Sequence, residues 1–425
     1  MISPESEIRG PAQRAVQRLE RLVRETGRSE GLEPSGIRVA IAPGRVNLLG
    51  GHTDYNEGYV LPVAVDRFVS CAVAVDDSGT IEFHSLDFDD RFTLELARLS
   101  NLRGDREEFE QLAGGRQSRW RRYVAGVILE MDEAAVPLAS GLVAIAGDVP
   151  VGSGLSSSAA LEAAIYTAFG TGVQATPEAA LLCQRAENRW AGVPCGIMDQ
   201  FASLLAEQGK ALFLDCRRLT YKNVSLPGQS AITVVDSGVR RELADGRYSR
   251  RRHEIETALE ILRKVAGPIK SLRDLSPGDL AGMEDLLPHT LRKRVEHVVG
   301  AIERVPKGVA HLALGEVERF GQLITECHHS LARLYEVSIP ELDIIVESAL
   351  EVDGVFGARL TGAGFGGCCV IFHREGCEEE LESAVTEAFE AGFGSGLSFH
   401  HLHAASGARL LSEAEISEIS ESSGS

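Results

Sequence analysis

The sequence predicts an α+β protein built from two domains. The chain has 425 residues, enough for two or three domains with substantial cores, and its strand and helix patterns mix without strict βαβ alternation. The pattern changes character near residues 215–235. We therefore expect an N-terminal domain over residues 1–215, a C-terminal domain over residues 216–412, and a disordered, Ser/Glu-rich tail over residues 413–425.

Helix and strand signals follow one another through the first half. An amphipathic helical pattern covers residues 11–28, and an alternating strand pattern begins at Ile37 and stops at Pro43. Further strands are expected over residues 60–75, 79–84, 142–146, 209–216 and 231–236. Helices are expected over residues 120–131, after the serines at 156–158, from Thr176 in the order N-cap then Pro, and repeatedly from about residue 249. A last strand is expected over residues 368–372.

Composition and charge exclude several classes of protein. The net charge is −19, from 43 basic and 62 acidic side chains, so the chain lacks the basic surface that nucleic-acid binding requires. No apolar run reaches the roughly 20 residues that span a bilayer. The start of the chain has no secretory apolar segment, and the eight cysteines are not at metal-ligand spacing. We expect a cytoplasmic, monomeric protein without nucleic-acid or membrane partners.

Residues 150–160 (PVGSGLSSSAA) form the most informative loop. An expected strand leads into small residues, and a helix begins at the serines. Helix N-termini present unpaired N–H groups and a positive dipole end, which suits an anion such as phosphate. No Gly-Lys-Ser/Thr closes the loop, so it is not a Walker A motif. A glycine-rich turn with a serine N-cap remains the alternative.

Two further segments carry polar side chains at expected loop positions. Residues 44–56 (GRVNLLGGHTDYN) place Arg, His and Asp just after a strand, where they can grip sugar hydroxyls or simply satisfy one another. Asp199 stands where a Gly/Pro-rich loop turns into a helix, so it is either a proton acceptor or a helix-terminal charge. Residues 360–368 contain a G-x-G-x-G pattern, but a strand follows it, which excludes a dinucleotide fold.

Taken in order, these segments resemble the galactokinase family of GHMP small-molecule kinases. Residues 44–62 resemble its sugar signature, residues 150–160 its phosphate loop and residues 360–368 its third motif. Matches at residues 120–127, 184–188 and 215–217 extend the resemblance over about residues 38–373. It implies a two-domain GHMP kinase fold with the active site in the interdomain cleft, and ATP-dependent phosphorylation of the C1 hydroxyl of galactose, the first step of galactose catabolism.

The resemblance also assigns roles to residues. Arg45 and Asp199 match the catalytic pair. The positions that bind the sugar are matched by His52, Thr53, Asp54, Gly196 and Tyr248. Those that bind ATP are matched by Trp120, Pro150, Gly152, Ser153, Gly154, Leu155, Ser156, Ser157, Ser158 and Ala159, and Mg²⁺ is assigned to Ser157 and Glu187. Asp199 would accept or orient the proton of the C1 hydroxyl, while Arg45 stabilises the charge.

The chain departs from the family at Gly51, where galactokinases carry a Glu that helps bind the C6 hydroxyl. Losing such a charge-assisted hydrogen bond costs about 1.5–3 kcal/mol. Another group or a water replaces it, or the preferred sugar lacks that hydroxyl, as arabinose does, or carries a C6 carboxylate, as galacturonate does. The otherwise intact motif favours galactose. A non-catalytic galactose- and ATP-sensing regulator is a further alternative, disfavoured because the serine-rich loop is complete.

Overall fold

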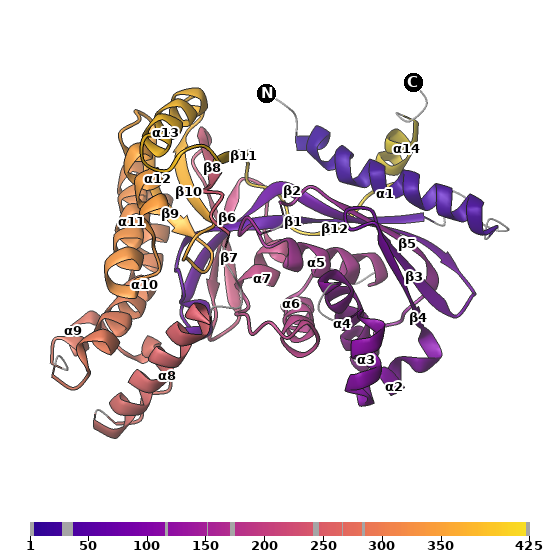
Figure 1. The fold of residues 1–425 in the computed structure, drawn as a ribbon, viewed down its shortest axis with the longest axis horizontal. Helices are drawn as coiled ribbons and strands as arrows, with labels where there is room; N and C mark the ends of the chain where they lie inside the picture. Colours follow the sequence, from indigo (N-terminus) through magenta and orange to yellow (C-terminus); the bar gives the residue numbers. More distant parts are fainter. Residues whose placement is uncertain are drawn as a thin grey trace.

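A mixed sheet of eight strands forms the centre of the N-terminal half in the computed structural model (Figure 1), which describes residues 4–27, 37–114, 118–150, 152–170, 175–240, 246–265, 267–282 and 285–421. Its strands are β1 (Ile37–Leu49), β2 (Tyr59–Asp76), β3 (Thr80–Ser85), β4 (Asp90–Glu95), β5 (Ser140–Gly147), β6 (Lys210–Asp215), β7 (Thr220–Ser225) and β12 (Arg409–Leu410). The order is β12-β1-β2-β5-β3-β4, with β6 and β7 added at one end of β2. Among these described strands, only β3 and β5 pair in parallel.

Helices cover both faces of this sheet. One face carries α1 (Pro4–Thr26) and α14 (Glu413–Glu421), and the other carries the layer of helices that follows β4. That layer comprises α2 (Leu99–Gly104), α3 (Arg106–Leu112), α4 (Arg119–Glu133), α5 (Ser157–Phe169), α6 (Pro177–Ala186), the π-helical η4 (Glu187–Ala191) and α7 (Met198–Leu205). Because both faces are covered, β1 and β2 are buried almost continuously and do not alternate between core and solvent.

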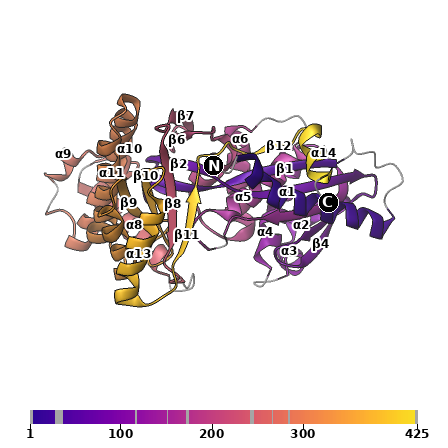
Figure 2. The same cartoon turned by 90° about the horizontal axis from the view of Figure 1, so that it is seen from above.

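The C-terminal half is built on a separate antiparallel sheet (Figure 2). It contains β8 (Ser230–Asp236), β9 (Val355–Thr361), β10 (Cys368–Arg374) and β11 (Ser398–Leu402) in the order β11-β8-β10-β9. Its helices are α8 (Arg247–Val265), α9 (Pro277–Leu280), α10 (His289–Leu314), α11 (Val317–Ser330), the π-helical η7 (Leu331–Tyr335), α12 (Pro340–Leu350) and α13 (Glu378–Phe393). The predicted α+β class is confirmed by these two sheets and their helices. No helix among the described residues is long and apolar enough to cross a membrane.

The sheets divide the chain differently from the predicted domain limits. β7 pairs with β6 and stays in the first sheet, so the change of sheet falls between Ser225 and Ser230 rather than at residue 215. After β11 the chain returns to the first sheet, where β12 pairs with β1. The tail expected to be disordered contains α14 over residues 413–421, because Ile416 and Ile419, three residues apart, pack on the core under α1.

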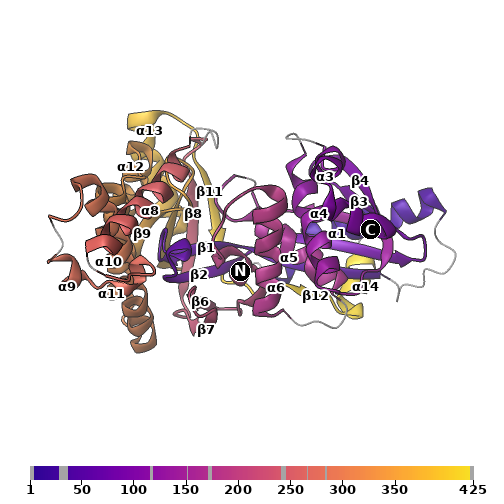
Figure 3. The same cartoon turned by 90° about the horizontal axis from the view of Figure 1, so that it is seen from below.

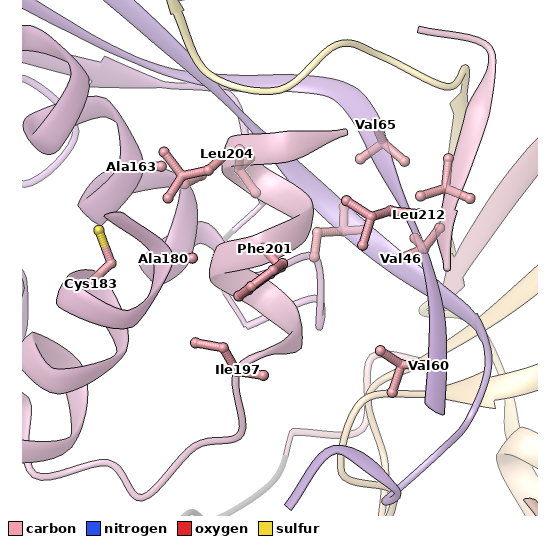
Figure 4. Close-up of a cluster of buried hydrophobic side chains, with 14 of the residues drawn as sticks. Val46, Val60, Val65, Ala163, Ala180, Cys183, Ile197, Phe201, Leu204 and Leu212 are labelled. Carbon is pink, nitrogen blue, oxygen red and sulfur yellow. The ribbon is translucent and has the colours of Figure 1, made fainter. Parts of the chain in front are cut away.

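The short helix α7 is held firmly against the first sheet. Ser203 Oγ donates to the Pro43 carbonyl of β1 at 2.7 Å. Phe201 is fully buried beside it. Figure 4 shows α7 at the centre of a cluster that continues into α6 through Ala180 and Cys183 and into the sheet through Val46, Val65 and Leu212. This packing fixes the position of Asp199, which lies in the first turn of α7.

We expect Phe201→Ala to lower the free energy of unfolding by about 3–5 kcal/mol, because it leaves a cavity between α7 and the sheet. Phe393→Ala is the matched control, since that ring is 43% exposed at the end of α13, and its effect should be about 0.5 kcal/mol. Urea denaturation of both variants measures the difference. Equal losses in the two variants would contradict the anchoring role of Phe201.

Candidate active site

An ion pair between Arg45 and Asp199 joins β1 to α7. Arg45 Nε donates to Asp199 Oδ1 at 2.7 Å and Nη2 donates to Oδ2, so the guanidinium grips the carboxylate with two bonds. The third nitrogen, Nη1, donates to the carbonyl of Gly154 at 2.6 Å. Ser156 Oγ donates to Asp199 Oδ2 at 2.5 Å. One carboxylate therefore ties together a strand, a helix and the loop before α5.

That loop has a backbone shape suited to an anion. Gly152, Gly154 and Ser156 all have positive φ, of 83°, 78° and 57°. The buried Leu155 anchors the loop, and its carbonyl accepts from Arg45 N at 2.9 Å. A Cβ at Gly44 would lie 2.7 Å from the same carbonyl, so only glycine lets β1 approach this closely.

The N-terminus of α5 points its backbone donors out of this loop. Ser156 is the N-cap, yet its side chain does not cap the helix, because the hydroxyl is directed at Asp199 instead. The first-turn N–H groups of Ser157, Ser158 and Ala159 are then the donors that an anion can use. Pro150 and Ser153 lie at the loop's start, where Ser153 Oγ donates to the Pro150 carbonyl at 2.7 Å; Val151 lies outside the described residues.

A cavity of about 900 Å³ opens beside the ion pair. It draws on both halves of the chain, which lie side by side in Figure 3. Six of the predicted residues line it: Arg45, His52, Asp54, Gly196, Asp199 and Tyr248. The structure thus brings together the two predicted catalytic residues and four of the five predicted sugar-binding residues.

Asp54 lies against the backbone of Gly196. A Cβ at residue 196 would fall 1.7 Å from Asp54 Oδ2, so a larger residue cannot occupy this position. Burial, and then the charge of Asp199, raise the pKa of Asp54 to about 6. Two carboxylates therefore face the same cavity, and Asp54 loses its charge in weakly acidic solution.

His52 adopts a strained backbone conformation, with φ of 62°. Its Nδ1 lies 2.9 Å from Tyr55 Oη, which in turn lies 2.9 Å from Tyr335 Oη. The His52 ring also packs against Tyr248, with centroids 5.9 Å apart. Because Tyr248 and Tyr335 come from α8 and η7, this end of the cavity is completed by the second half of the chain.

The other predicted residues do not line this cavity: the loop of residues 150–159 and Glu187 adjoin it through Asp199, and Thr53 and Trp120 have buried partners elsewhere. Thr53 is fully buried, and its Oγ1 donates to the carbonyls of Gly50 and Tyr59, which favours a role in shaping the loop. Trp120 is also buried, with Nε1 donating to Asp90 Oδ2 at 2.9 Å and its ring stacked on Phe88. Their contacts with sugar and with adenine stay predictions.

Glu187 belongs to a buried acidic cluster next to α5. The amide nitrogen of Gln200 donates to Glu187 Oε2 at 2.7 Å and to Glu162 Oε2 at 3.1 Å, and Ser158 Oγ lies 3.4 Å from Glu187 Oε1. Burial raises the pKa of both carboxyl groups, and the charge of Asp199 further raises that of Glu187. Glu162 Oε1 has no hydrogen-bond partner among the described residues.

These groups suit a hard divalent cation whose coordination shell is completed by oxygens from other molecules. Carboxylates and hydroxyls are the ligands Mg²⁺ prefers, usually one or two of them together with substrate phosphates and water. The described part of the chain contains no set of three or more His, Cys, Asp or Glu side chains that would hold a metal by itself. Glu187 and the nearby serine hydroxyls of α5 are therefore the protein ligands we infer for Mg²⁺.

Sequence reasoning missed several side chains that line the cavity. Asn47 lies two residues after Arg45, and its buried Oδ1 has no partner in the described ranges. Arg359 reaches the cavity from β9, where it is 1% exposed. The only local signal for Arg359 was a charged residue within an apolar strand pattern, Val355–Thr361.

Three family models match successive parts of the chain. The galactokinase galactose-binding signature matches residues 29–75, the GHMP kinases N terminal domain residues 122–207, and the GHMP kinases C terminal model residues 309–391. The mevalonate kinase of Methanococcus jannaschii, 19% identical with a TM-score of 0.57, has the same fold. Together with the cavity between the two halves, these matches define the class: the molecule is a GHMP kinase.

Similar proteins identify the family of this chain within the GHMP kinases. A galactokinase of Roseiflexus sp. (strain RS-1) is 38% identical over 383 residues, which cover 89% of this chain and 94% of that protein. A galactokinase of Chloroflexus aggregans is 43% identical over 336 residues, covering 78% and 83%. The crystal structure of Lactococcus lactis galactokinase complexed with galactose matches with a TM-score of 0.82 and 30% identity, covering 92% and 100%. The chain belongs to the galactokinase family and is an ATP-dependent sugar kinase, so the predicted resemblance is confirmed.

Activity should depend on the ionisation of Asp54. Because its pKa is raised to about 6, the carboxylate predicted to accept sugar hydroxyls is lost as the pH falls below that value. We expect kcat/KM for the sugar to drop about tenfold per pH unit below 6, with little change in KM for ATP. Steady-state profiles between pH 5 and 8 measure this. Asp54→Asn should lack the acid limb, and an unchanged limb in that variant would assign it to another group.

Proposed function

We propose that the enzyme transfers the γ-phosphoryl group of ATP to the C1 hydroxyl of galactose. The Arg45–Asp199–Ser156 junction is the observation that carries this proposal. It stands where the loop of residues 150–159 meets the cavity through Asp199. If that loop holds the nucleotide phosphates, an acceptor hydroxyl beside Asp199 would also lie beside the transferred group. Phosphoryl transfer requires such an in-line arrangement and neutralisation of charge on the transferring oxygens.

Asp199 would receive or orient the proton of the attacking hydroxyl. The C1 hydroxyl is hemiacetal and therefore more acidic than an ordinary alcohol, so a carboxylate of modest basicity suffices. Arg45 and Ser156 occupy both acceptor sites of Asp199 Oδ2, whereas Oδ1 receives Arg45 Nε and keeps one site to accept another hydrogen bond. Arg45 holds the carboxylate in place and contributes positive charge where negative charge develops.

The nucleotide phosphates would lie on the loop of residues 150–159. The first-turn N–H groups of α5 and the positive end of its dipole suit the triphosphate. Mg²⁺, when bound, would supply the neutralisation of phosphate charge that a protein of net charge −19 lacks. Glu187 and Ser157 are its proposed ligands, Ser157 being the first residue of α5.

Asp54, His52 and Tyr248 would hold the sugar ring. Asp54 offers two acceptors to hydroxyl groups, and His52 is fixed by Tyr55 on one side and packs on Tyr248 on the other. The backbone of Gly196 closes this side, because nothing larger fits next to Asp54. The Oδ1 of Asn47 supplies a further buried acceptor at the wall of the cavity.

Asp199→Asn should lower kcat by at least about 100-fold if the carboxylate takes the proton, while KM for ATP changes little. The amide keeps the size of the side chain, so a coupled ADP-release assay with galactose reports the chemistry rather than the fold. Ser156→Ala is a graded control that removes one hydrogen bond to Asp199 and should cost less. Turnover close to that of the unmodified enzyme in Asp199→Asn would remove Asp199 from this role.

Magnesium binding should release a proton from Glu187. Because burial and Asp199 raise the pKa of Glu187, the protonated form competes with the metal as the pH falls. We expect the Mg²⁺ concentration for half-maximal activity to rise as the pH is lowered from 8 to 6. In Glu187→Gln this concentration should be higher at every pH and should not change with pH. An identical pH dependence in Glu187→Gln would exclude Glu187 as the linked group.

A further inference from the structure

Arg359 is a buried cation without an anionic partner among the described residues. It is 1% exposed, and its Nε and Nη1 donate to the carbonyls of Leu360 and Leu48, at 2.9 and 3.2 Å. In the part of the chain that the structure describes, it forms no ion pair with any carboxylate, whereas Arg45 is paired with Asp199. An arginine stays charged in proteins, and a buried charge is costly unless an anion or a full set of hydrogen bonds compensates it.

The described groups around Arg359 do not supply that compensation. His297 Nε2 lies 3.2 Å from the Gly51 carbonyl, and burial lowers the pKa of this ring well below its usual value, so it is neutral. Leu331 lies on the other side of Gly51. Arg359 lines the cavity together with Gly51, His52 and Asp54.

Gly51 keeps the space in front of the guanidinium open. A Cβ at this position would lie only 2.8 Å from Arg359 Nη2 and 3.4 Å from Leu331 Cδ1. Any acidic side chain at residue 51 would therefore stand directly beside the guanidinium and neutralise it. With glycine here, the two donors of Nη2 remain for a group that the substrate brings.

We propose that Arg359 binds a carboxylate of the sugar, so that the enzyme phosphorylates a hexuronic acid of galacto configuration, galacturonate, in addition to galactose. This inference rests on the proposed transfer to C1. In an aldohexose ring, C6 is the carbon that can be a carboxylate while the ring and the C1 hydroxyl stay intact. Guanidinium and carboxylate match in shape and charge, which makes this pairing strong in a water-poor site.

The first experiment compares D-galactose, D-galacturonate, L-arabinose and D-glucuronate as acceptors for the purified full-length chain. ADP release gives kcat/KM, and the product is identified as the 1-phosphate by NMR. We expect kcat/KM for galacturonate to be at least equal to that for galactose and at least about tenfold above that for arabinose, which lacks C6. Glucuronate, which differs at C4 alone, should be a poor substrate.

The second experiment changes charge at residue 51 with size held constant. We expect Gly51→Glu to lower kcat/KM for galacturonate by about 100-fold or more, because the new carboxylate occupies Arg359 and repels the sugar. Gly51→Gln is the matched neutral control and should lower it much less. Arg359→Gln should lower kcat/KM for galacturonate far more than kcat/KM for galactose. Arg359→Lys should recover part of the lost kcat/KM for galacturonate. Thermal unfolding checks that each variant is folded.

The outcomes separate the two proposals. The role of Arg359 is overturned if the enzyme turns over galactose normally but does not turn over galacturonate. It is also overturned if Gly51→Glu and Gly51→Gln have equal effects on both sugars. Either result leaves the proposed C1 kinase activity intact. Failure to release ADP with any of the four sugars would overturn the proposed function itself.

Discussion

The position of one carboxylate, that of Asp199, organises the catalytic end of the molecule. Its charge is balanced by Arg45, and its second oxygen also receives the hydroxyl of Ser156. Arg45 is buried and Asp199 is partly exposed, so removal of Asp199 would leave the arginine charge without its partner. The pair can therefore hold β1, α7 and the phosphate loop in a fixed relation, and the anchoring of α7 by Phe201 and Ser203 sets its geometry.

The serine at the N-cap of α5 does not cap the helix with its side chain. A serine at this position normally satisfies one of the free N–H groups of the first turn. Here Ser156 has φ of 57° and gives its hydroxyl to Asp199, so the first turn keeps its donors for a ligand. His52 lines the cavity and Ser156 contacts Asp199, which lines it, so both strained residues lie at the site, where such strain is commonly stored. Under the proposed function, both segments give up local stability for binding.

The sequence predicted the parts of the site that are local in the chain. The loop before α5 and the segment from Arg45 to Asp54 were recognisable because glycine, serine and charged residues gather there within a short stretch. Arg359 and Glu162 were not, because their importance depends on partners far along the chain, Leu48 and Glu187. The expectation that the first strand stops at Pro43 was wrong, because β1 continues through a bulge to Leu49 and Arg45 lies inside it. The sequence also did not predict that the chain returns to β1 through β12. A strand of two residues is too short to show a periodic pattern.

The two halves contribute differently to recognition. The residues proposed to bind phosphate all come from the first half. The end of the cavity proposed to bind the sugar includes Tyr248 and Arg359 of the second half, and Tyr335 of that half packs on His52. Arg359 is held by the Leu48 carbonyl, so the same side chain joins β9 to β1 and forms the cavity wall. Under the proposed function, a charged residue at position 51 would alter the charge that faces the sugar without touching the groups proposed to hold ATP. Such a division lets acceptor specificity vary while the phosphoryl-transfer machinery stays fixed.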